Sequence, residues 1–124
     1  MRIAVSASDA NGIDSAVAMH FGRCPFYVLV DMDDLAVTEV TVVNNPFFQS
    51  HEPGAVPGFI NEQGANVMLA GGMGARALQF FEQFGIEAVT GASGTVRSSI
   101  EQYFGGEISG AAPCNHGEAH EDCQ

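Results

Sequence analysis

The sequence contains no lysine and no tryptophan, and its four basic residues are outnumbered by fifteen acidic ones. The formal net charge of -11 repels a phosphate backbone instead of releasing its counterions, so we expect no nucleic-acid partner. Because lysine is missing, no P-loop of the GxxxxGK[ST] type is present either. The composition therefore excludes two common classes of phosphate-binding protein.

Cysteines are few, and long apolar runs are missing. The three cysteines, at positions 24, 114 and 123, form no disulfide framework and fit a reducing compartment. No run approaches transmembrane length, and polar residues follow the first short apolar stretch too soon for a signal-peptide core. We therefore expect a cytoplasmic protein that has no contact with a membrane.

The length of 124 residues and the 46% apolar content fit one ordinary domain with a real core. We place a single α/β domain at residues 1–109. From residue 110 the apolar periodicity is lost, and we expect a flexible tail at residues 110–124.

The stretch at residues 66–84 organises the rest of the chain. An apolar run at residues 67–70 reads as a buried strand, three glycines follow within residues 71–74, and an amphipathic helix begins there. Such a turn suits an anion, since backbone N–H groups approach a ligand freely and the helix start carries partial positive charge. Close packing of the helix on the strand explains the glycines equally well.

The remaining elements follow in order. We expect strands at residues 2–6, 26–31, 36–44 and 86–90, a loop at residues 7–19, and further helices ending near residues 63 and 104, the second capped by Thr95. This order predicts a mixed sheet with helices on both faces and the first strand beside the later parallel strands. The predicted core contains Val67, Leu69, Leu78, Phe81, Val89 and Ile100.

Ligands of such sheets gather at the carboxyl ends of the parallel strands. The loop after the first strand, the turn at residues 71–74 and the similar turn at residues 91–94 converge there. The loop ends in His20, Arg23 and Cys24, which bring together an imidazole, a cation and a thiol. Arg23 paired with an acid and Cys24 buried as a small hydrophobe are the alternatives, and Phe21 fits the core.

The tail carries a second cluster of ligand-type residues, Cys114, His116, His120 and Cys123, in a C-x-H-x3-H-x2-C array. Thiols and imidazoles favour zinc or copper, although this spacing is not that of a standard zinc finger. The alternative is a solvated tail that binds nothing specific.

Four motifs together resemble a known family: the opening MRIAVSA, HFGRCPFYVLVD at 20–31, VMLAGGMGARAL at 67–78 and TGASGTV followed by I-x-x-Y-x-x-G. The chain is similar to the dinitrogenase iron-molybdenum cofactor biosynthesis proteins. The resemblance implies a three-layer ribonuclease-H-like α/β fold with a mixed five-stranded sheet. It also implies non-catalytic carriage of a preformed molybdenum-containing sulfide cluster, of the Mo-Cu or Fe-Mo type, during cofactor assembly or metal handling.

The resemblance further implies which residues form the cluster pocket: His20, Phe21, Gly22, Arg23, Cys24, Asn45, His51, Gly71, Gly72, Met73, Gly74, Gly91, Ala92 and Gly94. An interaction domain that docks on a P-loop ATPase or a cofactor-assembly scaffold is one alternative function. Another is a nuclease-like metal-dependent hydrolase, which needs carboxylates on the first strand. That strand has none, and only Asp9 and Asp31 are at hand.

Overall fold

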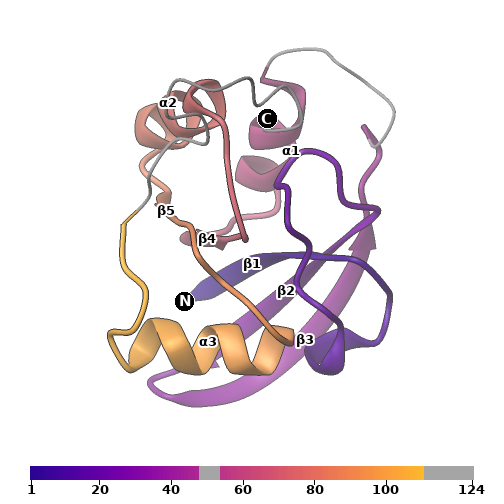
Figure 1. Cartoon of the computed structure of the whole chain (residues 1–124), viewed down its shortest axis with the longest axis vertical. Helices are drawn as coiled ribbons and strands as arrows, with labels where there is room; N and C mark the ends of the chain where they lie inside the picture. Colours follow the sequence, from indigo (N-terminus) through magenta and orange to yellow (C-terminus); the bar gives the residue numbers. More distant parts are fainter. Residues whose placement is uncertain (48–53, 111–124) are drawn as a thin grey trace.

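The structure, a computed structural model, describes residues 1–47 and 54–110 (Figure 1). Five strands and three α-helices follow in the order β1 Arg2–Ala7, β2 Phe26–Asp33, β3 Ala36–Asn44, α1 Ala55–Glu62, β4 Val67–Leu69, α2 Ala75–Phe84, β5 Glu87–Val89 and α3 Val96–Phe104. A short 3₁₀ helix, η1, spans Gly12–Asp14 between β1 and β2.

The strands form one open mixed sheet in the order β3-β2-β1-β4-β5. The first strand lies in its middle: Ile3 pairs antiparallel with Val30 of β2 and parallel with Val67 of β4. The β2–β3 pair is an antiparallel hairpin, and β4 and β5 are parallel. The predicted mixed sheet, with its first strand beside the parallel ones, is confirmed.

The helices cover both faces of the sheet, as Figure 1 shows with α3 on the side opposite α1 and α2. On the α1 and α2 side, a buried cluster includes Ile60 and Phe81 from the helices and Met68 from β4. On the other side, Val96 and Ile100 of α3 pack with the valine-rich face of the sheet. The fold is therefore a three-layer α/β arrangement, and residues of β1 and β4 contribute to both cores.

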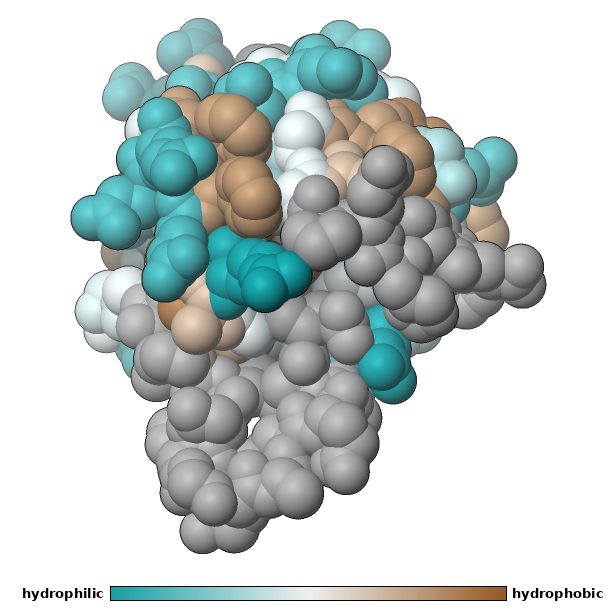
Figure 2. Space-filling view, turned by 90° about the horizontal axis from the view of Figure 1, so that it is seen from above, coloured by the Kyte–Doolittle hydropathy of each residue, from teal (hydrophilic) through white to brown (hydrophobic). Residues whose placement is uncertain are grey.

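Five of the six predicted core residues are buried, and Leu78 of α2 is the exception. Ala77 and Phe81 are buried, whereas Leu78 is only partly buried and Phe84 is 37% exposed. The phenylalanine ring of Phe84 stacks on Phe80 at the surface, with centroids 6.4 Å apart. Figure 2 looks onto the α1 and α2 side of the molecule and shows apolar surface between hydrophilic groups. One helix on one sheet buries only a narrow stripe, so apolar residues at its margin stay near solvent.

Residues 7–19 form the predicted loop between β1 and β2, with only Ala7 still in β1, and this loop is more ordered than the sequence indicates. Besides η1, the segment forms antiparallel bridges from Ala7 to Val17 and from Ala16 to Thr95. The amide of Val17 donates to the Gly94 carbonyl at 2.9 Å. These bonds join backbone groups, which have no signature in the side-chain pattern.

The start of α3 follows the prediction. Thr95 accepts a hydrogen bond from the Ser98 amide at 3.1 Å, and the Ser98 hydroxyl accepts one from the Thr95 amide at 2.9 Å. This reciprocal capping box satisfies two amides that the helix leaves unpaired.

Among the described helices, none combines the length and the hydropathy needed to cross a bilayer.

Candidate functional site

Three segments far apart in the sequence are joined at the carboxyl ends of the parallel strands. The Phe21 amide donates to the Gly72 carbonyl at 3.0 Å, and the Gly91 amide donates to the Gly71 carbonyl at 3.1 Å. The predicted convergence of the loop after β1 with the turns after β4 and β5 is therefore present as direct backbone contact. We call this part of the molecule, residues 18–25, 71–77 and 90–95, the loop edge.

His20 and Arg23 lie at the surface of the loop edge. His20 is half-buried, and its backbone forms a parallel bridge with Gly72 of the glycine turn. Arg23 is exposed, and Gly22 between them is partly exposed. An imidazole and a guanidinium thus accompany the same stretch of backbone.

The side chains of Phe21 and Cys24 are buried in the core under the loop that contains His20 and Arg23. Each is 1% exposed, and the Phe21 ring packs against Tyr27 and Phe81 with centroids 5.8 Å and 5.1 Å away. The Cys24 thiol and the Tyr27 hydroxyl both donate to the Phe21 carbonyl, at 3.4 Å and 2.6 Å. Burial raises the pKa of the Cys24 thiol and raises that of Tyr27 well above its usual value. Both groups therefore stay protonated at neutral pH and hold the loop from below.

Asn45 supports the loop from the end of β3. It is 6% exposed, and its side-chain amide donates to the Cys24 carbonyl at 2.9 Å. Its carbonyl oxygen accepts from the Phe47 amide at 2.9 Å. Asn45 thus positions the backbone around residue 24, and its polar atoms are occupied within the protein.

The glycine turns serve packing as well as access. A Cβ added to Gly71 would lie 2.8 Å from the Met19 carbonyl oxygen and 3.0 Å from Met19 Cα, closer than any side chain tolerates. Gly94 has φ of +79°, and its added Cβ would lie 2.5 Å from the Ser98 hydroxyl. Close approach therefore explains these two glycines: Gly71 lies against the backbone of residues 18 and 19, and Gly94 lies against the Ser98 side chain.

The two turns also present residues of other kinds. Gly74 is the N-cap of α2 with extended backbone, φ −76° and ψ 163°, and Met73 beside it is fully buried. In the turn after β5, Ala92 is buried and Gly91 is exposed. The first amides of α2 have no partner within that helix, which leaves donors at its N-terminus.

One signal at this edge escaped the sequence reasoning. The chain has fifteen acidic residues, yet none lies in the loop edge at residues 18–25, 71–77 and 90–95. The same segments contain Arg23 and also Arg76, an exposed residue in the first turn of α2. Counting acids between successive elements would have found both the acid-free segments and the second arginine.

The acids named for a hydrolase do not meet at one site. Asp9 accepts hydrogen bonds from the Asn11 and Ala16 amides at 3.2 Å and 3.3 Å, within its own loop. Asp31 pairs with Arg2 at the opposite edge of the sheet, at 2.8 Å. Within residues 1–47 and 54–110, no three His, Cys, Asp or Glu residues are close enough to hold a metal ion together.

His51 and the tail residues Cys114, His116, His120 and Cys123 lie outside the described residues. Gly110, the last residue that the structure describes, contacts the domain, because its carbonyl accepts a hydrogen bond from the Thr90 amide at 3.1 Å.

The fold and the loop edge together define an α/β protein whose candidate site consists of backbone groups, arginine and histidine, without carboxylates. The chain belongs to the family described as dinitrogenase iron-molybdenum cofactor, whose model matches residues 1–106.

Solved structures agree with this membership. The chain is similar to a protein named PH0822, with 40% identity, a TM-score of 0.78, and coverage of 89% of this chain and 96% of that one. It is also similar to the apo form of the orange protein from Desulfovibrio gigas, with 32% identity, a TM-score of 0.78, and coverage of 92% and 95%. TM1290 from Thermotoga, described as a NifB protein of the DUF35 family, shares the fold at 21% identity, with a TM-score of 0.76 and coverage of 94% and 98%. No curated protein matches the chain.

Proposed function

We propose that the chain binds and carries a preformed anionic metal-sulfur cluster, containing molybdenum with iron or copper, and catalyses no reaction. The observation that carries this proposal is the acid-free loop edge of a protein with a formal charge of -11. An anion is retained by such a chain only where donors are concentrated and carboxylates are excluded. Family membership supports a role in cofactor biosynthesis or cluster binding.

The chemistry of the edge fits such a cargo. Arg23 and Arg76 supply charged donors, His20 supplies an imidazole, and the start of α2 supplies amides with partial positive charge. Sulfide and oxo groups of a cluster accept hydrogen bonds from all of these. Cys24 is assigned a supporting role, because its buried, protonated thiol is a poor metal ligand.

The alternative functions have less support. A two-metal hydrolase needs neighbouring carboxylates, and Asp9 and Asp31 are engaged at opposite edges of the sheet. Docking on a P-loop ATPase or an assembly scaffold remains a prediction about the partner that donates or receives the cluster. The ribonuclease-H-like label and the cytoplasmic location likewise remain predictions.

The tail is proposed as a second site of opposite charge. Cys114, His116, His120 and Cys123 would hold zinc or copper, and the neighbouring acids attract cations. Deleting residues 111–124 should lower zinc or copper stoichiometry and leave the urea midpoint of the domain unchanged. A large loss of stability would show instead that the tail packs on the domain.

The direct test of the cluster site is Arg23→Ala, with Arg76→Ala beside it. The protein is incubated with molybdate, copper and sulfide, passed through gel filtration, and assayed for co-eluting molybdenum and copper. Loss of a charged donor should weaken cluster binding by about 1.5 to 3 kcal/mol per arginine. Circular dichroism should stay unchanged, because both side chains are exposed.

Arg97→Ala is the matched control, since Arg97 is also exposed but lies on α3, 3.5 Å from Asp14. It changes the net charge equally, so a general electrostatic effect would lower binding in all three variants. If Arg23→Ala and Arg76→Ala both keep the wild-type metal content, the loop edge is not the cluster site.

A further inference from the structure

Strand β3 is an edge strand of the sheet and lies away from the parallel strands. Within the described residues, β3 is hydrogen bonded to β2 alone, so its outer side presents backbone donors and acceptors to solvent. Residues 36–41 of this nine-residue strand are exposed. A strand in this position is a template for the addition of another strand.

Proteins usually protect such edges with lysine, proline or a very short edge strand. The sequence AVTEVTVVN of β3 contains neither of those residues and only one charge, Glu39. The strand is also long, and β-branched residues dominate it. The pairing with β2 shifts register where Asp31 pairs with Glu39 and Met32 with Val37, so this edge has an irregularity at Thr38 but no lysine or proline.

An apolar groove adjoins β3 on the α3 side of the sheet. Val40 pairs with Val30 and Val37 pairs with Met32, which places both on that face. They are 36% and 44% exposed, and Leu35 in the hairpin turn is 75% exposed. The groove, of about 480 Å³, runs from Leu35 and Val37 to Ile100 and Phe104 of α3.

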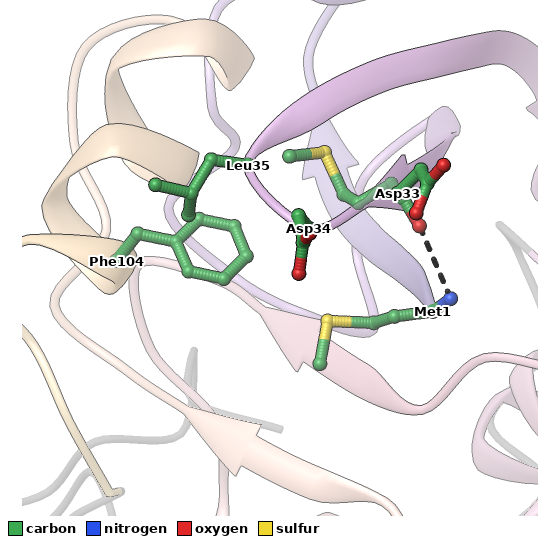
Figure 3. Close-up of a pocket in the computed structure, with 6 residues that line it drawn as sticks. Met1, Asp33, Asp34, Leu35 and Phe104 are labelled. Atoms are coloured by element: carbon green, nitrogen blue, oxygen red, sulfur yellow. Dashed lines mark hydrogen bonds between the residues drawn. The ribbon is translucent and has the colours of Figure 1, made fainter.

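The hollow continues past the hairpin turn toward the N-terminus of the chain, lined by Met1, Asp33, Asp34, Leu35 and Phe104. Figure 3 shows the Leu35 side chain against the Phe104 ring, with Asp34 beside the hollow. The N-terminal amine donates to the Met32 carbonyl at 3.3 Å, which fixes Met1 there.

The charges at the rim indicate what the groove receives. Asp33, Asp34 and Glu101 stand around an apolar floor, whereas Arg97 is the basic residue lining it and pairs with Asp14. A second copy of this chain would bring another formal charge of -11 to this acidic surface. The tail is also unsuited, because residues 111–124 are acidic and have no large apolar side chain.

We propose that β3 and this groove bind an extended segment of a partner protein in which apolar side chains alternate with basic ones. Its backbone would extend the sheet beside β3. Its apolar side chains, all on one face of the added strand, would lie over Val37, Val40 and Phe104. Its basic side chains would meet Asp33, Asp34 and Glu101, so that charge complementarity selects the partner.

The position of this surface suits a carrier. Met1 at the start of β1 and Phe104 at the end of α3 mark the edge of the sheet opposite the loop edge. A partner on β3 therefore leaves the loop edge accessible.

The experiment uses a nine-residue peptide of alternating valine and lysine, capped at both ends, as the probe, matched to the length of β3. Binding is measured by titration calorimetry and by amide hydrogen exchange on the full chain. Two single-charge variants are compared. Val40→Lys places a cation on the α3 face of β3, where Val40 pairs with Val30. Thr41→Lys places it on the same strand but on the other face, where Thr41 pairs with Leu29.

We expect Val40→Lys to weaken peptide binding about tenfold, the cost of losing an apolar anchor, and Thr41→Lys to change it about twofold or less. Amides of β3 should gain protection on binding. Equal weakening by the two variants, or equal binding of a serine–lysine peptide, would reduce the effect to general charge attraction and overturn the proposal. A self-associated protein that Val40→Lys makes monomeric would overturn it as well, since the occupant would then be a second copy.

Discussion

The two ends of the strands, the loop edge and the end opposite to it, hold their polar groups in different ways. At the loop edge, backbone bonds such as that from the Phe21 amide to the Gly72 carbonyl connect the segments. At the opposite end of the strands, an ion pair adds to the backbone bonds: Arg2 donates to both oxygens of Asp31 at 2.8 and 3.1 Å and to the Gln63 carbonyl at 2.6 Å. The Tyr103 hydroxyl likewise donates to Glu87 at 2.7 Å.

The two ends of the strands also differ in the surroundings of their arginines. Arg2 forms an ion pair with Asp31, and the hydrogen bond between them is the main cause that raises the pKa of Arg2. Arg23 and Arg76 lie in segments that contain no acid. The arginines of the loop edge are thus exposed in acid-free segments of the chain, which is the basis of the proposed cluster site.

The largest expected effect comes from removing the support beneath the loop edge. Phe21→Ala deletes a ring that is 1% exposed and contacts Tyr27 and Phe81, and it should cost about 3 to 5 kcal/mol of stability. Phe84→Ala is the control, because a ring that is 37% exposed should cost far less. Urea unfolding measures both, and equal midpoints would show that the loop is not anchored through its phenylalanine.

A second substitution tests the close approach of backbones at the same edge. Gly71→Ala places a Cβ 2.8 Å from the Met19 carbonyl oxygen, and the forced shift should cost about 1 to 3 kcal/mol. Gly58→Ala in α1 has nothing within 4 Å of the added Cβ and should stabilise by about 0.5 to 1 kcal/mol. Thermal unfolding should thus move in opposite directions for the two, and a neutral Gly71→Ala would mean that this contact is loose.

The smallest effect belongs to the opposite edge. The hydrogen bond from Arg2 lowers the pKa of Asp31, so its stabilisation is complete above the ordinary carboxyl value of 3.8 and is lost as the pH falls through the lower folded value. Both side chains are partly exposed, so Asp31→Asn should cost only about 0.2 to 1 kcal/mol at pH 7. Unfolding free energies measured from pH 7 to pH 2 should converge for the two proteins. A difference that persists at pH 2 would show that the carboxylate charge is not its source.

The sequence predicts the sheet well because its signals are strong and local. The apolar run before Gly71, the alternation around Val40 and the capping pair of Thr95 and Ser98 each act over a few residues. Chain order and short connections then place β1 beside β4. The convergence of His20 with the two turns follows from the same topology.

The sequence does not decide the role of a residue whose side chain suits either a ligand site or the protein core. A cysteine is both a metal ligand and a small hydrophobe, so only the structure shows the Cys24 thiol bonded to the Phe21 carbonyl. Asn45 is equally ambiguous until its amide is found on the Cys24 carbonyl. The bridge from Ala16 to Thr95 has no side-chain signal at all.

The central position of β1 has a consequence for synthesis of the chain. Its partner on one side, β2, begins at Phe26, but its partner on the other side, β4, begins at Val67. A ribosome adding about 5 to 20 residues per second therefore leaves one edge of this apolar strand unpaired for several seconds. The hairpin of β2 and β3 is complete by then and offers β1 its first shelter, so nascent chains stopped before residue 67 should be the ones that chaperones retain.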